Sequence, residues 1–296
     1  MSRIEVEDLT RIRAEDPRAI ARAAAERLRP EGLLGEHGGL LMVACDHPAR
    51  GALGAGARGN AMADRPELLR RLVHVLEDPA VNGILASPDV LDDLLLLDAL
   101  HGKVVVGSMN RGGLLGSAWE LDDRFTAYTP AAIHAAGFEG GKTLTRIDLS
   151  DPGTVATLEA TGRAVTDLAE RGLMAMLEPF VSARDASGKL ANVLTADAVA
   201  SSSAVCAGLG ASSAHTWLKV PMVDDMATAM RATTLPAVVL GGEVSADAAA
   251  TYERWRTALE LPTVYGLALG RGLLFPADDD VDAALTAVTG LMDAVA

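Results

Sequence analysis

The stretch GGLLMVACDHPARG, residues 38–51, decides the fold class. Its first half is a short, almost continuous apolar run, and its second half has the polar and small residues of a loop. A strand that is apolar on both faces predicts a sheet buried on both faces, which is typical of parallel sheets. The turn after the run lacks the G-x-G-x-x-G fingerprint of a dinucleotide-binding open sheet.

Seven further runs of this kind follow along the chain. They cover residues 81–87, 103–108, 140–147, 172–179, 215–221, 235–242 and 263–270. Between the runs, apolar residues recur three and four positions apart, as Leu69, Leu72 and Leu76 do, and this spacing predicts helices. Parallel strands need crossover helices, so eight alternating units predict an α/β fold, a closed (β/α)8 TIM barrel. A doubly wound open sheet is the alternative.

The length of 296 residues fits one domain, because α/β barrels often run to ~250 residues as a single unit. We expect a single domain over 1–296, with a helical extension over 1–37 and the barrel over 38–296. Within the extension, residues 15–30 predict one additional helix. We expect this helix to close the bottom of the barrel.

Composition excludes several classes of partner. The formal net charge is −14, and both nucleic acid and anionic membranes require a positive footprint, so we expect neither as a partner. The start of the chain has no apolar signal core, and no run of about 18 apolar residues occurs, which predicts a cytoplasmic protein. Cys45 and Cys206 form no disulfide framework. The six histidines show no ligand spacing, so we expect neither a metal nor another cofactor.

Ionisable residues gather at the expected carboxyl ends of the strands, where TIM barrels place their catalytic groups. They are Asp46, His47, Asp89, Arg111, Lys142, Arg146, Glu178, Lys219 and Arg271. Lysine is rare in this chain, with four lysines among the 26 Lys and Arg residues, and yet Lys142 and Lys219 both lie within predicted strands. A lysine in a strand is therefore a candidate functional residue.

Lys219, in HTWLKVP, has two interpretations. Its methylene stem could extend the ammonium from a strand edge to solvent. If it is buried, its pKa falls and it becomes an amine nucleophile towards carbonyls. Glu178, in MAMLEPF, is either a structural ion-pair partner or a general acid/base whose pKa is raised by apolar surroundings. We expect Lys142 to help keep Lys219 neutral by like-charge repulsion.

The last two strands end in VVLGGEVS and GLALGRGLLFP. Glycines there would let backbone N–H groups approach an anion, and a short helix that starts near Gly270 would point its N-terminus at the same place. Arg271 could bind a phosphate group through two N–H bonds. We therefore expect Gly241, Gly242, Gly270 and Arg271 to form a phosphate site.

The order in which these candidate site residues follow one another along the predicted strands resembles a known family. It consists of Asp-His after the first strand, Lys in the fourth, Glu in the fifth, Lys in the sixth, and GG and GR after the last two. This order resembles the class I, Schiff-base aldolases of the DeoC/LacD/DhnA group. The likeness is strongest to tagatose-bisphosphate and sulfofructose-phosphate aldolases and to the barrel proteins found with inositol-catabolism genes in actinobacteria.

The resemblance implies a metal-independent carbon–carbon lyase of carbohydrate metabolism that self-associates into a homo-oligomer. Lys219 would form the iminium, Glu178 would shuttle protons, and Lys142 and Asp46 would contact substrate hydroxyls. The substrate would be a phosphorylated ketose or keto-sugar acid, cleaved to dihydroxyacetone phosphate and an aldehyde.

Three alternatives stay open. The same lysine could serve a deoxyribose-phosphate aldolase or a thiolase-like transferase. A phosphosugar isomerase would need the carboxylate but not Lys219. A non-catalytic barrel would bind a sugar phosphate without a covalent adduct.

Overall fold

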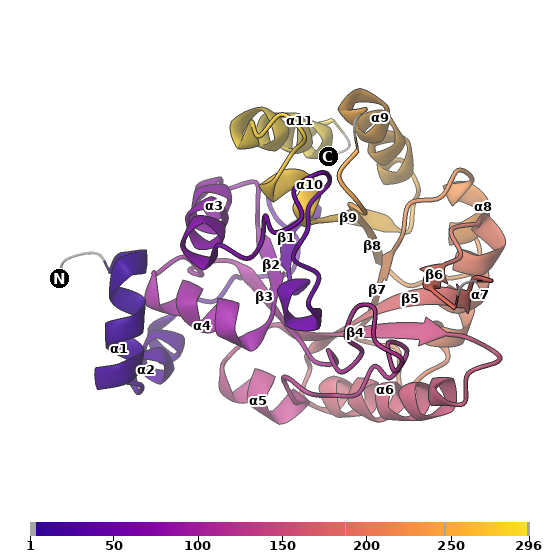
Figure 1. Cartoon of the computed structure of the whole chain (residues 1–296), viewed down its shortest axis with the longest axis horizontal. Helices are drawn as coiled ribbons and strands as arrows, with labels where there is room; N and C mark the ends of the chain where they lie inside the picture. Colours follow the sequence, from indigo (N-terminus) through magenta and orange to yellow (C-terminus); the bar gives the residue numbers. More distant parts are fainter. Residues whose placement is uncertain (1–3, 187, 246, 295–296) are drawn as a thin grey trace.

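Eight parallel strands form a closed barrel in the computed structural model, which describes residues 4–186, 188–245 and 247–294 (Figure 1). The barrel strands are β1 Leu40–Cys45, β2 Gly83–Ala86, β3 Val104–Ser108, β4 Gly140–Ile147, β5 Met174–Arg184, β7 Thr216–Val220, β8 Ala237–Leu240 and β9 Val264–Leu269. Each pairs in parallel with the next around the ring, and β9 pairs with β1 to close it. The predicted TIM barrel is confirmed. The expected domain limits, residues 1 and 296, lie outside the described ranges.

Helices follow the strands and surround the barrel (Figure 1). They are α3 Arg65–Glu77, α4 Pro88–Leu96, α5 Pro130–Ala135, α6 Gly153–Glu170, α7 Ala196–Ala207, α8 Met226–Met230, α9 Ala248–Leu259, α10 Arg271–Leu274 and α11 Val281–Asp293. Several of them begin with side-chain caps. The side chain of Asp64 caps α3 by accepting a hydrogen bond from the backbone N–H of Glu67. The side chain of Thr195 caps α7 by accepting one from the backbone N–H of Ala198.

Strand periodicity decides which side chains enter the barrel. Successive side chains of a strand point to opposite faces. Leu40, Met42 and Ala44 of β1 belong to a small apolar cluster that is separate from the large core between strands and helices. Met174 and Met176 of β5 and Trp217 of β7 join the same inner cluster. The next inward positions of these strands are polar, namely Asp46, Glu178 and Lys219. These polar side chains therefore lie above a layer of apolar side chains inside the barrel.

The N-terminal extension differs from our expectation. Two short helices, α1 Leu9–Glu15 and α2 Ala19–Glu26, replace the single helix expected over 15–30. The break falls at Asp16, because the residue before a proline is disfavoured in the α conformation. The helix α2 packs beside α4 on the outside of the barrel, so the prediction that a helix closes the bottom is wrong. Leu33, in the segment after α2, packs against the inner apolar cluster instead.

The strand β5 extends beyond its expected end and forms a hairpin with β6 Leu190–Asn192. The pairing is antiparallel, with Ser182 opposite Asn192, and the Ser182 Oγ donates to Asn192 Oδ1 at 2.8 Å. The hairpin stands above the carboxyl end of the barrel sheet and supplies one wall of the pocket described below.

Candidate active site

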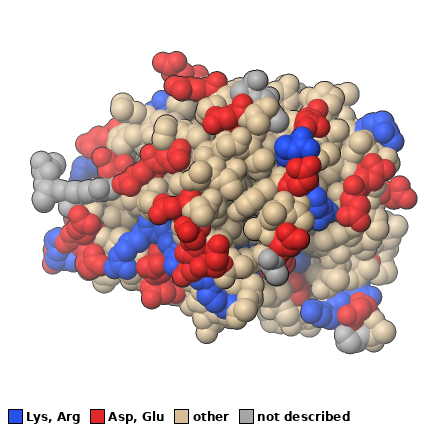
Figure 2. All heavy atoms as spheres, turned by 90° about the horizontal axis from the view of Figure 1, so that it is seen from above, with Lys and Arg blue, Asp and Glu red and all other residues tan. Residues whose placement is uncertain are grey.

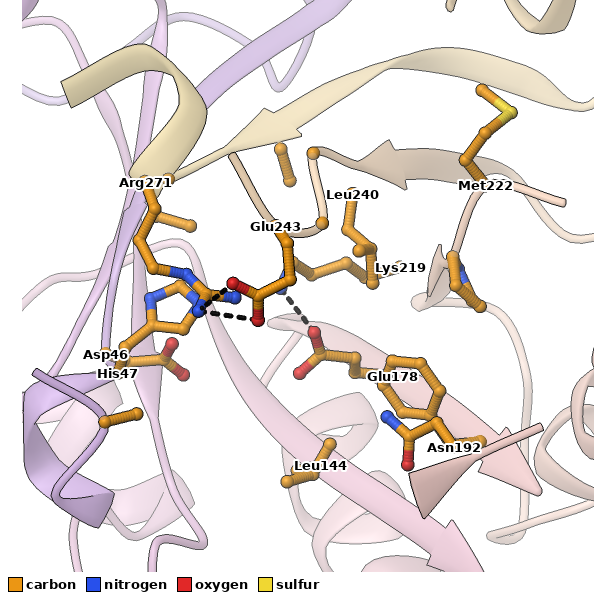
Figure 3. A pocket seen from close by; sticks show the side chains of 18 of the residues that line it. Asp46, His47, Leu144, Glu178, Asn192, Lys219, Met222, Leu240, Glu243 and Arg271 are labelled. Carbon is orange, nitrogen blue, oxygen red and sulfur yellow. Dashed lines mark hydrogen bonds and ion pairs between the residues drawn. The ribbon is translucent and has the colours of Figure 1, made fainter. Parts of the chain in front are cut away.

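A pocket of about 460 Å³ is lined by residues at the carboxyl ends of the barrel strands (Figure 3). Of the predicted site residues, the lining includes Asp46, Glu178, Lys219, Gly241, Gly242, Gly270 and Arg271. Lys142 lies beneath them and is fully buried. The structure therefore brings the predicted residues of six strand ends to one place, although they are up to 225 positions apart in the chain.

Lys219 is buried at the floor of this pocket. Its side chain is 3% exposed, so the interpretation in which it extends to solvent is wrong. Its Nζ donates a hydrogen bond to Oε1 of Glu178 at 2.5 Å, and Figure 3 shows the two side chains pointing toward each other. Burial lowers the pKa of Lys219, the Glu178 carboxylate opposes that change, and the nearby Arg111 and Arg271 cations add to it. A lowered pKa increases the neutral, nucleophilic fraction of the amine.

Glu178 is surrounded by cations as well as by apolar strand residues. Burial raises its pKa, but Lys142, Lys219 and Arg111 lower it by more, and the pKa lies well below its usual value. Of the two interpretations of Glu178, the raised pKa is therefore wrong, because three cations from different strands converge here and the sequence does not show this convergence. The ion-pair interpretation agrees with the contacts to Lys142 and Lys219. The Glu178 carboxylate is therefore ionised in the free protein at neutral pH.

Lys142 connects the two carboxylates of the floor. Its Nζ lies 3.3 Å from Oδ2 of Asp46 and also forms an ion pair with Glu178. Burial lowers the pKa of Lys142 strongly, and Arg111 lowers it further. Burial is the largest cause of the lowered pKa of Lys219, and the charge of Lys219 is among the causes that lower the pKa of Lys142, so repulsion between the two lysines acts beside burial.

Asp46 presents an unused acceptor to the site. Its Oδ2 accepts a hydrogen bond from Ser108 Oγ at 3.0 Å and is paired with Lys142 and Arg111. Its Oδ1 is buried and has no hydrogen-bond partner. A buried acceptor without a donor is costly, so this oxygen is suited to a ligand hydroxyl.

Arg111 is a site residue to which the sequence assigned no role. Its Nε donates to Ser108 Oγ at 3.0 Å, and its guanidinium pairs with Asp46. Burial lowers its pKa to about 10, a value at which it stays cationic at neutral pH. Its position directly after the third strand was the available signal.

The residues that we expect to form a phosphate site lie at the ends of β8 and β9. Arg271 begins α10 with Gly270 as its N-cap, so the predicted short helix is confirmed. Gly242 has a φ of 70°, a conformation that favours glycine. A Cβ on Gly270 would lie 2.7 Å from the Ala44 carbonyl oxygen, so packing alone requires that glycine. The Gly241 N–H donates to the Ala268 carbonyl oxygen at 3.2 Å.

Two further residues line the pocket near Arg271, and the sequence predicted a role for neither of them. Glu243 forms an ion pair with Arg271, and a carboxylate after the GG pair was the signal for it. His47 lines the pocket with its Nδ1 buried and without a hydrogen-bond partner. Burial lowers the pKa of His47 well below its usual value, and Arg271 and Lys219 lower it further, so the ring is neutral.

Other residues from the strand ends lie outside the pocket. Asp89 is in the first turn of α4 and pairs with Arg65, and Arg146 pairs with the buried Asp123. Among the described residues, no group of three or more His, Cys, Asp or Glu side chains is placed to hold a metal ion. In the same part of the chain, no helix is both long and apolar enough to cross a membrane.

Comparison with known proteins gives one family and several similar folds. A sequence model of the Cgl0159-like family matches residues 38–289. The crystal structure of Cgl0159 from Corynebacterium glutamicum is 48% identical, covers 97% of this chain and 96% of its own, and has a TM-score of 0.93. No curated protein matches.

Fructose-bisphosphate aldolases share the fold at low identity. One is an archaeal fructose-1,6-bisphosphate aldolase with its catalytic Lys covalently bound to the carbinolamine intermediate of the substrate. It is 16% identical, with a TM-score of 0.65 and coverage of 93% of this chain and 99% of that chain. Another, from Slackia heliotrinireducens, is 16% identical, with a TM-score of 0.61 and coverage of 98% and 96%.

Proposed function

The chain belongs to the Cgl0159-like family, and we propose that it is a class I aldolase that binds its ketone substrate as a Schiff base on Lys219. The observation that carries the proposal is the buried contact between Lys219 and Glu178, 2.5 Å long, at the floor of the pocket. An amine nucleophile beside a base, with the base held by a further cation, is the arrangement that imine chemistry requires. An aldolase of the same fold holds its substrate as a carbinolamine on a lysine.

The reaction begins at the neutral amine of Lys219. Its lone pair attacks the ketone carbon, and the carbinolamine takes up one proton from solvent and loses water to give an iminium; the final hydrolysis releases that proton again. Glu178 then accepts the proton of the hydroxyl two carbons away, the carbon–carbon bond breaks, and its electron pair moves to the iminium nitrogen. An aldehyde leaves and an enamine remains. The protonated Glu178 returns the proton to the enamine carbon, and water hydrolyses the iminium to release the ketone product.

Asp46 would hold a substrate hydroxyl, and Lys142, which lies beneath the pocket lining, would support Asp46 and Glu178. The unpartnered Oδ1 of Asp46 can accept a hydrogen bond from one substrate hydroxyl. Lys142 keeps the carboxylates of Asp46 and Glu178 in place. Because these groups are fixed by buried ion pairs, little reorganisation is needed when the substrate enters.

Charge supports an anionic substrate. The protein as a whole carries −14, and Figure 2 shows acidic side chains spread over one face. The pocket lining nevertheless contains Lys219 and four arginines, Arg50, Arg111, Arg254 and Arg271, against three carboxylates. Arg50 and Arg254 also pair with Glu120 and Asp224 outside the lining. The cations that face the pocket still outnumber its carboxylates, which favours a phosphorylated ligand, here a ketose or keto-sugar acid that yields dihydroxyacetone phosphate.

A cleavage assay tests the proposal. The protein is incubated with fructose bisphosphate, tagatose bisphosphate, sulfofructose phosphate and phosphorylated keto-sugar acids, and the released aldehyde is measured. We expect cleavage of at least one substrate by the natural chain and by Lys189→Met, which alters an exposed lysine, and none by Lys219→Met. Equal cleavage by Lys219→Met would contradict a Schiff-base mechanism. Isomerisation without cleavage would favour the phosphosugar isomerase.

A further inference from the structure

The cation of the expected phosphate site already has an anion of this chain on it. Arg271 Nη1 lies 2.7 Å from Glu243 Oε1 and 2.8 Å from Oε2 (Figure 3). Both carboxylate oxygens therefore contact the same nitrogen, whereas the strong arginine–carboxylate geometry uses two nitrogens in parallel. Arg271 Nε is buried and has no hydrogen-bond partner. The guanidinium is thus held by a contact that leaves part of its donor capacity unused.

The two partners differ sharply in exposure. The Arg271 side chain is 15% exposed and forms part of the pocket wall, while the Glu243 side chain is 75% exposed. Glu243 therefore approaches Arg271 from the solvent side, and it can return to water without a change in the fold. Ion pairs with an exposed partner contribute little to stability, so their separation costs little.

The position of Glu243 in the chain supports this. It follows Gly241 and Gly242 in the loop between β8 and α9, and both Glu243 and Arg271 line the pocket whose floor holds Lys219. A phosphate group that binds Arg271 at Nη1, the nitrogen that carries the contact with Glu243, must take the place of the Glu243 carboxylate, because two anions at one guanidinium nitrogen repel each other.

We propose that Glu243 is a specificity-determining residue, an internal anion that occupies the phosphate subsite until a tethered substrate displaces it. The proposal rests on the proposed Schiff-base function. Free phosphate competes with Glu243 only at its bulk concentration. The phosphate of a ketone bound to Lys219 competes at the high effective concentration of a tethered group, and so it displaces Glu243. Glu243 thus lowers the occupancy of the subsite by free phosphate, whereas the phosphate of a ketone bound to Lys219 still fills the subsite.

Titration calorimetry with inorganic phosphate tests this role. We expect Glu243→Gln to bind inorganic phosphate about two- to fivefold more tightly than the natural chain, the range that follows from loss of an exposed ion pair. Glu253→Gln is the matched control, because Glu253 is an exposed glutamate that pairs with Arg256 in α9, outside the pocket. It should leave phosphate affinity unchanged. Unchanged or weaker binding in Glu243→Gln would overturn the proposal, as would an equal gain in the control.

Arg271→Gln and borohydride trapping separate this proposal from the function on which it rests. If Arg271→Gln weakens phosphate binding and Glu243→Gln has no effect, the subsite stands and the role of Glu243 falls. If Arg271→Gln binds phosphate as the natural chain does, phosphate is not bound at Arg271 and the role of Glu243 falls with the subsite. Trapping of dihydroxyacetone phosphate on Lys219 is measured separately in each variant. Absence of trapping in the natural chain would contradict the Schiff-base function, and the phosphate affinities would still test the role of Glu243. In Glu243→Gln we expect inorganic phosphate to suppress trapping at a two- to fivefold lower concentration.

Discussion

The Nζ of Lys219 lies 2.5 Å from Oε1 of Glu178, and both side chains are buried between β5 and β7. Burial and the Glu178 carboxylate have opposite effects on the pKa of the Lys219 amine, and therefore on its reactivity. Burial lowers the pKa of Lys219, while the carboxylate raises it. The same carboxylate is the base that the proposed cleavage needs, so its removal separates the two effects.

Glu178→Gln is expected to move the acid limb of imine formation to lower pH. The substitution removes the negative charge that raises the pKa of Lys219, so the amine stays neutral at lower pH. Carbon–carbon cleavage should fall by about 10²–10⁴-fold, because the acid/base group is lost. The measurements are the pH dependence of borohydride trapping and the cleavage rate. Glu253→Gln, outside the pocket, should change neither, and an acid limb that stays in place or moves to higher pH in Glu178→Gln would refute the electrostatic account.

Lys142→Met is expected to destabilise the fold by about 3–5 kcal/mol, the usual cost of removing one partner from a buried ion pair. The substitution leaves Asp46 and Glu178 without a shared donor in a site with almost no exposed surface. Urea unfolding followed by circular dichroism measures the change. The matched control is Lys189→Met on the exposed hairpin, which should stay within about 0.5 kcal/mol of the natural chain. Equal stability of the two variants would show that Lys142 does not hold the floor together.

Gly270→Ala is expected to cost about 1–3 kcal/mol, because its Cβ would lie 2.7 Å from the Ala44 carbonyl oxygen and 3.0 Å from His47 Cε1. Gly272→Ala, two residues later in α10, is the control, since a Cβ there meets nothing within 4 Å. Thermal unfolding should show a lower midpoint for Gly270→Ala only. A lower midpoint in both variants would point to a general intolerance of α10 and not to the contact with β1.

The sequence was sufficient for the barrel and for the convergence of the floor residues. Eight apolar runs in alternation with helical segments predict the strand order, and the two-residue period of a strand places Glu178 above Met174 and Met176. Lys219 follows Trp217 in the same way. Residues at the carboxyl ends of parallel strands in a closed barrel meet at one mouth, whatever their separation in the chain.

The pKa of Glu178 and the β5–β6 hairpin could not be predicted from the sequence. The pKa of Glu178 depends on three cations from other strands, and their distances are set by the closure of the barrel and not by local sequence. The β5–β6 hairpin is short and half exposed, so its residues lack the apolar run that marks the other strands. Glu243 directly follows the GG pair, so the sequence marks its position, but only the contact with Arg271 gives it a role.

Borohydride trapping followed by peptide mass mapping is the most direct test of Lys219 as the Schiff-base residue. The protein is incubated with dihydroxyacetone phosphate, reduced and digested, and each of the four lysine-containing regions is examined for the reduced adduct. We predict one adduct, on Lys219, that depends on the ketone and is absent from Lys219→Met. Lys142 should stay unmodified, because it lies beneath the pocket and not in its lining, and its Nζ is paired with both Asp46 and Glu178. No adduct on Lys219 with this ketone or with any phosphorylated ketose that the protein binds would contradict the central claim.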